Sequence, residues 1–277
     1  MSSNLILVIG ATGKTGKRVA SNLIEKGVPV RDVSRSSVLR FDWGDASTWA
    51  PALEGVHAVY LVHPGLGFPG ATEQVEAFAS AAAAAGVKKV VMASTPDDGS
   101  EFSQAMRAAE THIVKAGLGL TSLRLRWFFQ NFSEDFLLEP VRSGELRLPA
   151  GDGNEAFVDA DDIAEVAVAA LTDDRHLGLN YDLTGPRALS FADIAQEISA
   201  GSNHTLSYVA VDSVTYVAEQ IAQQVPEEWA YSFAGLYQDI ASGKLAQVSS
   251  DIETVLGKPA RDFSGFVAAM AQSGVWK

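Results

Sequence analysis

Residues 5–23 read LILVIGATGKTGKRVASNL, and this stretch decides the fold. It begins with a continuous apolar run, Leu5–Ile9, of the kind found in parallel strands buried on both faces. Three glycines follow with two residues between each pair: Gly10, Gly13 and Gly16. Residues 17–26 then show the apolar periodicity of a helix. The stretch therefore predicts a strand, a glycine-rich turn and a helix.

Two kinds of phosphate-binding loop contain such glycines. An ATP-binding P-loop needs glycine, four residues and then Gly-Lys-Ser/Thr, which would require a glycine where Val8 stands. The dinucleotide-binding turn fits instead, because its glycines let the backbone approach a pyrophosphate at the positive end of the helix. The alternative is an ordinary tight strand-to-helix turn. The candidate residues of this loop are Gly10, Thr12, Gly13, Lys14, Thr15 and Gly16.

The composition excludes several classes of protein. The chain has 277 residues, of which 47% are hydrophobic, and its net charge is −13. Such an acidic surface repels nucleic-acid backbones, so we expect no nucleic-acid partner. Cysteine is absent, which agrees with a cytoplasmic protein and excludes disulfides. We also expect no leader peptide and no membrane partner, since no basic, apolar leader and no run of membrane-spanning length is present.

The first half of the chain alternates strands and helices. This alternation predicts an α/β fold, a Rossmann-type doubly wound parallel sheet. Further strands are expected at residues 28–34, 38–43, 56–62, 88–94 and 120–125, and helices at 47–53, 72–85 and 101–116.

The end of the second strand decides which dinucleotide is expected. NAD-binding folds have a carboxylate there, whereas NADP-binding folds have a cation for the 2′-phosphate. Here the strand ends in VSRSS, with Arg35 and Ser36 at that position and Asp32 three residues earlier. This predicts NADP(H); the alternative is a solvated surface arginine. Asp42 is expected to accept from the adenine amino group, or to be a turn residue. Other cofactor candidates at strand ends are Trp43, Val62, His63, Pro64 and Ser94.

Beyond residue 130 the alternation becomes irregular. We expect residues 1–130 to form the NADP-binding core, with residues 156–185 returning to it through a helix in VDADDIAEVAVAAL and a late strand at 181–183. Ser190 and Asp193 have the spacing of a capping box that opens another helix. Residues 131–277 are expected to form a smaller, mostly helical lobe that binds substrate.

Several phrases together are similar to those of a known family. GATGKTG, VSRSS, RFDW, ALEGVHAVYLV, LRLRWFFQNF, FVDADDIAEVA and YDLTGP resemble the NmrA-like atypical short-chain dehydrogenase/reductases, and most of all the group of agroclavine and festuclavine dehydrogenases. The resemblance covers roughly residues 4–200 and is looser beyond. It implies an NADP(H)-binding Rossmann fold. Some members transfer hydride to quinones, dyes, double bonds or imines, whereas others are redox-sensing regulators without chemistry.

The usual proton donor of the wider superfamily is absent. Its Tyr-x-x-x-Lys motif should lie on the helix at 101–116, which reads EFSQAMRAAETHIVKA and contains no tyrosine. A ketone needs its developing alkoxide protonated or stabilised. An iminium ion needs no general acid, because hydride addition gives a neutral amine. A quinone is intermediate. The missing tyrosine agrees equally with a sensor that performs no chemistry.

Three residues are candidates for catalysis: Ser94, His63 and Arg107. His63 follows a strand and titrates near neutrality, but can also line the crevice through its backbone. Ser94 holds the position of the superfamily's substrate-orienting serine, or caps a strand. Arg107 either contacts substrate or replaces the missing lysine; the alternative is a solvent-facing helix arginine.

Substrate contacts are expected from loop carboxylates and aromatic residues. Asp97 would favour a cationic substrate, and an aromatic wall would stack on a planar one. The alternatives are a solvated loop and core packing. The candidates are Asp97, Trp127, Phe128, Asn131 and Trp229. The five histidines show no ligand spacing, so we expect no metal site.

The sequence thus predicts an NADPH-dependent reductase of a small, planar, electron-poor organic substrate. An imine or iminium is favoured, and a quinone or activated C=C bond comes second. The alternative is a non-catalytic NADP(H)-sensing regulator of the NmrA type. A monomer or homodimer is expected.

Overall fold

The computed structural model describes residues 4–277, which form two compact units. Within these residues, the first unit comprises the chain up to Leu125, together with Ala160–Leu183 and Asp251–Lys258. The second unit comprises Arg126–Asp159, Thr184–Ser250 and Pro259–Lys277. Each unit has its own hydrophobic core.

The first unit is built on a six-stranded parallel sheet with the order β2-β1-β3-β4-β5-β8. From β1 the chain passes first to β2, on one side of β1, and then returns to β3 on its other side. The direction of the strand order therefore reverses at β1. The expected doubly wound fold is confirmed. The strands are β1 Leu5–Ile9, β2 Val30–Val33, β3 Val56–Leu61, β4 Lys89–Ser94, β5 Gly119–Leu125 and β8 Asn180–Leu183.

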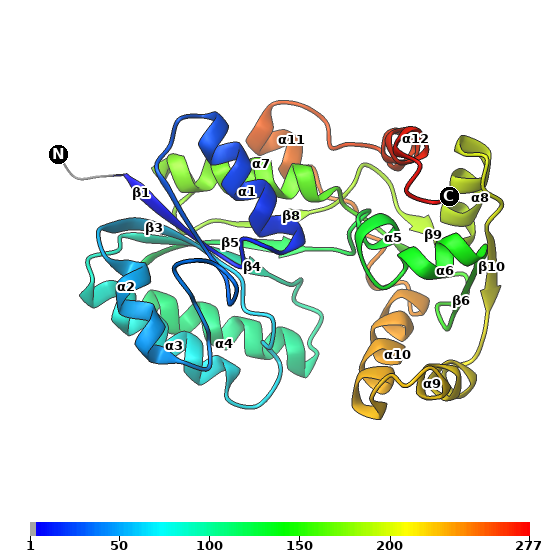
Figure 1. Cartoon of the computed structure of the whole chain (residues 1–277), viewed down its shortest axis with the longest axis horizontal. Coiled ribbons are helices and arrows are strands. Elements are labelled where there is room, and N and C mark those ends of the chain that lie inside the picture. Colours follow the sequence, from blue (N-terminus) through cyan, green and yellow to red (C-terminus); the bar gives the residue numbers. More distant parts are fainter. Residues whose placement is uncertain (1–3) are drawn as a thin grey trace. The chain divides into compact units, whose positions relative to one another are not determined.

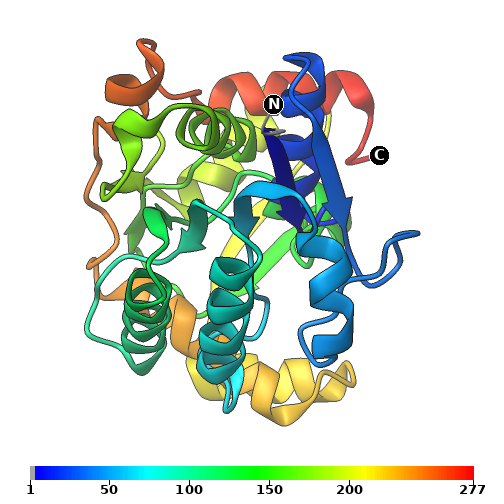
Figure 2. The same cartoon turned by 90° about the vertical axis from the view of Figure 1, so that its left-hand side faces the viewer.

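Helices cover both faces of this sheet (Figure 1). One face carries α1 Lys14–Glu25, α7 Ala160–Thr172 and α11 Asp251–Leu256. The other carries α2 Trp49–Leu53, α3 Ala71–Ala84 and α4 Glu101–Lys115. Figure 2 shows α3 and α4 side by side. Short 3-10 turns lie at Ala46–Thr48 and Asp174–His176.

The predicted strand at residues 38–43 is wrong. Only one isolated bridge, between Ser34 and Arg40, joins this segment to its neighbour. At this bridge the Phe41 amide donates to the Ser34 carbonyl at 3.0 Å, but the next amide, that of Asp42, donates to Thr48 Oγ1 at 3.1 Å instead of to a strand. Phe41 remains buried, so the apolar pattern marked a core contact and not a strand.

The second unit packs helices against two small sheets. Strands β6 Glu145–Leu148 and β10 Ser207–Ala210 are parallel, while β7 Asn154–Glu155 and β9 Leu189–Ser190 are antiparallel. The capping box predicted at Ser190 and Asp193 is confirmed. The helices of the second unit are α5 Asn131–Glu134, α6 Leu138–Ser143, α8 Phe191–Gly201, α9 Ser213–Ala222, α10 Glu227–Ala241 and α12 Phe263–Ser273.

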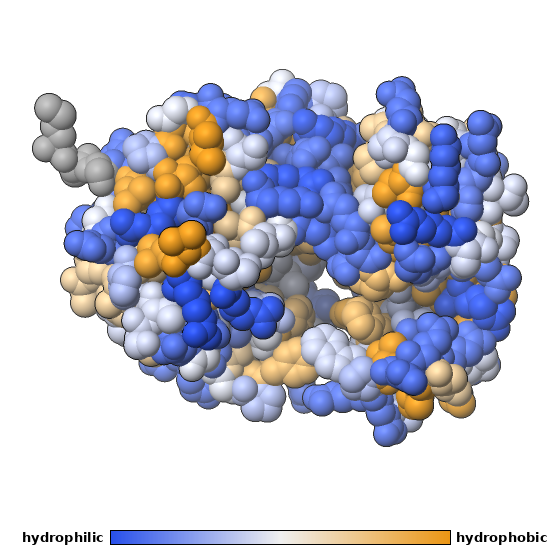
Figure 3. All heavy atoms as spheres, viewed as in Figure 1, coloured by the Kyte–Doolittle hydropathy of each residue, from blue (hydrophilic) through white to orange (hydrophobic). Residues whose placement is uncertain are grey.

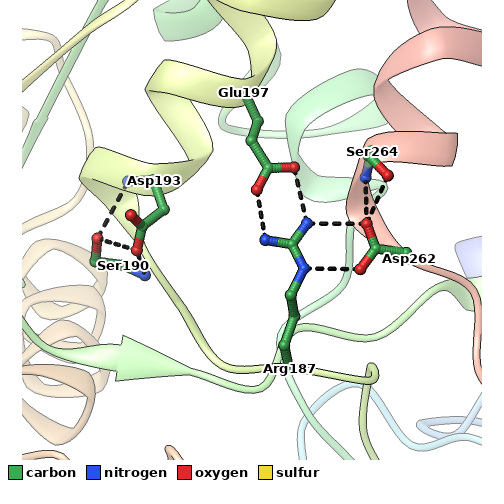
Figure 4. Close-up of polar contacts among 6 residues, drawn as sticks. All are labelled: Arg187, Ser190, Asp193, Glu197, Asp262 and Ser264. Carbon is green, nitrogen blue, oxygen red and sulfur yellow. Dashed lines mark hydrogen bonds and ion pairs between the residues drawn. The ribbon is translucent and has the colours of Figure 1, made fainter.

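One arginine ties two helices of the second unit together (Figure 4). The Arg187 guanidinium donates to both carboxylate oxygens of Glu197, on α8, at 2.6 and 2.9 Å. It also donates to both oxygens of Asp262, the N-cap of α12, at 2.7 and 2.9 Å. Two bidentate pairs on one guanidinium fix the relative positions of these helix segments more firmly than a single exposed ion pair would.

The surface in Figure 3 is mostly hydrophilic, with hydrophobic side chains in small scattered groups. Within residues 4–277, no helix combines the length and the apolar character needed to cross a bilayer.

Candidate functional site

The glycine loop closes tightly between β1 and α1. Gly10 has φ +76°, a conformation that glycine adopts without strain. A Cβ on Gly16 would lie 2.2 Å from the carbonyl oxygen of Gly10, and one on Gly13 would lie 3.2 Å from the same atom. Glycine is therefore required at position 16 so that the helix can begin close against the end of the strand.

Helix α1 begins at Lys14, three residues earlier than predicted, because extended Gly13 is its N-cap. No side chain caps this end, and its first turn contains no acidic residue. Thr12 is exposed and Thr15 is buried. Among residues 4–277 no side-chain cap occupies the positive end of this helix, and the arrangement fits a bound pyrophosphate.

The end of β2 presents hydroxyl groups and one cation. Ser34 Oγ is hydrogen-bonded to Ser36 Oγ at 3.2 Å and to Ser37 Oγ at 2.8 Å. Arg35 between them is exposed, and Asp32 lies within the strand, opposite Val8. This group of donors at the edge next to β1 fits a phosphate ester on a ribose.

Asp42 and Trp43 are already engaged in local contacts. Arg40 donates to Asp42 Oδ2 at 2.7 Å, and this hydrogen bond is the main cause that lowers the pKa of Asp42. The Trp43 indole donates to the carbonyl oxygen of Val62 at 3.1 Å, and its ring packs edge-to-face on Phe78. Trp43 is thus a half-buried residue packed against the core of the first unit.

His63 uses both ring nitrogens within the protein. Nδ1 accepts from the Gly65 amide at 3.1 Å, which leaves Nε2 to donate to Gln74 Oε1 at 2.9 Å. Burial lowers the pKa of His63, so the ring is neutral at pH 7. These contacts argue against His63 as a proton donor and favour the other role considered, that of a residue lining the end of β3. Pro64, next to it, is exposed.

Ser94 ends β4 and belongs to a polar network. Its Oγ donates to Glu110 Oε1 at 2.7 Å and accepts from Arg107 Nη2 at 2.5 Å. The Ser122 hydroxyl on β5 donates to the same Glu110 oxygen, and Arg107 lies 2.9 Å from it. Sequence reasoning missed Glu110 and Ser122, because no motif links residues on β4, α4 and β5.

Arg107 has donors that the network does not use. Its Nη2 also donates to the Thr95 carbonyl at 2.8 Å. Its Nε and Nη1 are buried and have no hydrogen-bond partner among residues 4–277, and the same holds for Thr95 Oγ1. The alternative considered for Arg107, a solvent-facing helix arginine, does not hold: the guanidinium contacts Ser94 and Glu110 at the end of β4.

The expected substrate residues have different surroundings. Asp97 is exposed on the loop between β4 and α4, in the first unit. In the second unit, the centroid of the Trp127 ring lies 5.1 Å from the ring centroid of Tyr237 and 5.9 Å from that of Phe136. Trp127 therefore joins an aromatic cluster that also packs the core.

The other three lie elsewhere in the second unit. Phe128 forms a bridge with Val158, Asn131 is buried at the start of α5, and Trp229 is 47% exposed on α10. Trp229 is thus the most accessible of the predicted aromatic contacts.

Glu155, on β7, was not singled out by sequence reasoning. Its side chain is fully buried, and neither carboxylate oxygen has a hydrogen-bond partner in the described chain. Burial raises the pKa of Glu155 to about 8, although the charge of Arg126 acts in the opposite direction. The carboxyl is therefore neutral at pH 7.

No group of three or more histidine, aspartate and glutamate side chains suited to hold a metal ion occurs within residues 4–277.

Known proteins resemble this chain over nearly its whole length. It is 35% identical to the uncharacterized oxidoreductase YesF of Bacillus subtilis, over 98% of this chain and 96% of that protein. It is 32% identical to an NAD(P)H azoreductase of Xenophilus azovorans, over 96% and 98%. It is 29% identical to agroclavine dehydrogenase of Claviceps fusiformis, over 95% and 96%.

Among solved structures, the NADPH-dependent quinone oxidoreductase of Escherichia coli has a TM-score of 0.82 at 23% identity, with 96% of this chain and 99% of that chain covered. This likeness concerns the fold. The sequence resemblance to clavine dehydrogenases is confirmed. The NmrA-like family model matches residues 2–263, and the chain belongs to the NmrA-like family.

Proposed function

We propose that this protein is an NADPH-dependent reductase. The observation that carries the proposal is the glycine loop: a backbone cradle that a Cβ at Gly16 would fill, in front of a helix end with no side-chain cap. Such a cradle suits a dinucleotide pyrophosphate. The name of the azoreductase relative, which is 32% identical, supports the same cofactor class and a reductase activity.

The residues divide the cofactor between them. Residues 10–16 would hold the pyrophosphate, and Arg35 with Ser36 would hold the 2′-phosphate. Asp42 and Trp43 would border the adenine, and residues 62–64 with Ser94 would line the nicotinamide end. The bound nicotinamide would supply hydride from C4. The second unit, with Trp127, Phe128, Asn131 and Trp229, would bind the substrate.

The substrate is proposed to be small, planar and electron-poor. The absence of a tyrosine on α4 and the engaged nitrogens of His63 leave no evident general acid in this part of the chain. Substrates that accept hydride without strong acid catalysis therefore fit: iminium ions, quinones and activated C=C bonds. The relatives named azoreductase and agroclavine dehydrogenase agree with this range.

The test is NADPH oxidation by the purified protein, with NADH in parallel, over a panel of cyclic iminium ions, quinones and enones. We expect turnover with NADPH preferred, and none in a Gly16→Val variant. Tight NADPH binding without turnover on any of these substrates would refute the reductase and favour a redox sensor of the NmrA type.

A further inference from the structure

The hydroxyl group of Ser94 is already bonded to two charged neighbours. A serine hydroxyl has one proton to donate and two lone pairs that accept. Its proton is donated to Glu110 Oε1 at 2.7 Å, and one lone pair accepts from Arg107 Nη2 at 2.5 Å. These are the contacts of this hydroxyl within residues 4–277, and they leave one lone pair. Ser94 can therefore form one more hydrogen bond, and only as the acceptor.

Neither of these two bonds can run in the opposite direction. A guanidinium has donors only, so Arg107 cannot take the Ser94 proton. Glu110 forms an ion pair with Arg107 Nη2 at 2.9 Å, and the Ser122 hydroxyl on β5 donates to the same carboxylate oxygen. The Glu110 carboxylate thus accepts two hydroxyl protons, and the proton of Ser94 is not available to a ligand.

The position of Ser94 makes the remaining lone pair relevant to ligand binding. Ser94 is the last residue of β4, and β4 lies between β3 and β5 in the sheet. Open parallel sheets bind their ligands at this carboxyl end. A serine that orients a substrate carbonyl must donate a proton to it. The substrate-orienting role considered for Ser94 therefore does not fit the structure.

We propose that Ser94 accepts a hydrogen bond from the carboxamide amino group of the nicotinamide, and that Glu110 is the positioning residue that keeps a Ser94 lone pair available for it. This inference rests on the proposed NADPH cofactor, whose nicotinamide end Ser94 would line. The amino group of the carboxamide carries the N–H bonds of the nicotinamide ring system. Among the proposed substrates, quinones and enones offer oxygen acceptors at the reacting centre, which Ser94 cannot bind.

Such a bond would act on the orientation of the nicotinamide. Ser94 is 2% exposed, so water has little access to compete for its lone pair. A carboxamide held at one end restricts the rotation of the ring, and hydride transfer depends on a correctly oriented donor. Glu110 does not touch the cofactor in this scheme. It acts through Ser94, because it fixes the direction of the hydroxyl proton.

The first measurement needs no turnover. Isothermal titration calorimetry gives the Kd of NADP⁺ and that of 3-acetylpyridine adenine dinucleotide phosphate, in which an acetyl group without N–H replaces the carboxamide. We expect wild type to prefer NADP⁺, and Ser94→Ala to reduce this preference about 3- to 10-fold, the usual effect of losing one hydrogen bond. The Kd of the analogue should stay nearly unchanged, whereas a general structural defect would weaken both ligands.

Two further substitutions test the role of Glu110. Glu110→Gln keeps an oxygen that accepts from Ser94, so the preference for NADP⁺ should persist. Glu110→Met removes that acceptor and frees the Ser94 proton, so the preference should fall as in Ser94→Ala. Ser122→Ala is the matched control, because it removes the other hydroxyl that donates to Glu110 and leaves Ser94 in place. Its preference should equal that of wild type.

Three results would overturn the inference while leaving the cofactor site intact. The first is an unchanged preference in Ser94→Ala, and the second is an equal fall in Ser94→Ala and Ser122→Ala. The third is an unchanged preference together with a higher KM for substrates that carry an O–H or N–H group, which would assign the donor to the substrate. If wild type does not bind NADP⁺ at all, the proposed function fails and the inference fails with it.

Discussion

Glu155 shows how one residue departs from the usual rules of burial. A carboxylate inside a protein is normally paired or hydrogen-bonded, because an isolated buried charge is costly. For Glu155, burial outweighs the opposing charge of Arg126, so the neutral form is favoured. The folded state therefore holds a proton that the unfolded chain releases at neutral pH.

This proton makes stability depend on pH. The pKa of Glu155 is raised from an ordinary value of 4.5 to about 8. Between these values the native state binds more protons, so the free energy of unfolding falls as pH rises, by up to about 1.4 kcal/mol per pH unit. We expect Glu155→Gln to remove this slope. Urea unfolding from pH 5 to 8 should show the variant gaining on the wild type as pH rises.

Glu227→Gln serves as the control, since Glu227 is exposed on α10. A constant difference between wild type and Glu155→Gln across this range would contradict the assignment of a neutral carboxyl.

In the proposed cofactor site, Arg35 is the residue expected to give the preference for NADPH over NADH. A charge-assisted hydrogen bond to the 2′-phosphate contributes about 1.5–3 kcal/mol. Arg35→Ala should therefore raise the Kd of NADPH about 10- to 100-fold and leave that of NADH nearly unchanged, as measured by nicotinamide fluorescence. Arg175→Ala should alter neither. An equal loss for both cofactors would mean that Arg35 does not face the 2′-phosphate.

At the scale of elements, the junction of β1 and α1 requires a glycine, which has no Cβ, at position 16. The close approach of α1 to the Gly10 carbonyl leaves no room for a Cβ at position 16. The backbone must move if any other residue stands there, because the clashing atom is itself main chain.

Gly16→Ala should destabilise the protein by about 1–3 kcal/mol, as overpacking does, and weaken NADPH binding at least 10-fold. Gly235→Ala in α10 is the matched control, since nothing lies within 4 Å of a Cβ there. That change should stabilise the helix by up to about 1 kcal/mol. Thermal unfolding and cofactor titration of both variants check this; equal effects would exclude a specific role for the β1–α1 contact.

The ion pairs that Arg187 forms with Glu197 on α8 and with Asp262 at the start of α12 should make the stability of the second unit decrease in acid. Hydrogen bonds from Arg187 are the main cause that lowers the pKa of Asp262. The stabilisation is present above the ordinary pKa, about 3.9, and is lost as pH falls below it. Because Arg187 and Asp262 are over a third exposed, solvent screening limits the effect to about 1 kcal/mol.

Asp262→Asn should therefore be less stable than wild type at pH 7, and the two should converge between pH 4 and 2 (about the range of carboxyl titration). Unfolding followed by the tryptophan fluorescence of the protein checks this. A difference that persists undiminished at low pH would show that these contacts act through packing and not through charge.

At the scale of the whole molecule, two hydrophobic cores stabilise the fold and a large negative charge affects which partners can bind. Each unit has a separate set of buried residues, and the net charge of −13 disfavours polyanionic partners. A ligand that binds only the folded chain shifts the folding equilibrium by mass action.

NADPH should therefore raise the melting temperature. At a free concentration 100 times its Kd, the gain is about 2.7 kcal/mol, or about 5–10 °C for a chain of this size. Differential scanning calorimetry checks this. NADH at the same concentration should shift Tm less, and Gly16→Ala should reduce the shift, because its weaker binding leaves the site less saturated. Equal shifts with NADH would contradict the predicted preference.

The sequence by itself determined the strand, glycine turn and helix at residues 5–25, the alternating parallel fold and the capping box at Ser190. These features depend on neighbouring residues: on apolar periodicity, on the absence of a Cβ and on side chains that bond to nearby amides. Such local physics can be read without knowing the rest of the chain.

Only the tertiary structure decided that residues 38–43 form no strand, that Glu110 joins Ser94, Ser122 and Arg107, and that Glu155 is buried. Burial and hydrogen bonding of these groups depend on segments far apart in the chain. An arginine on a helix or a glutamate on a short strand looks the same in sequence whether water or protein surrounds it, and this surrounding decides its chemistry.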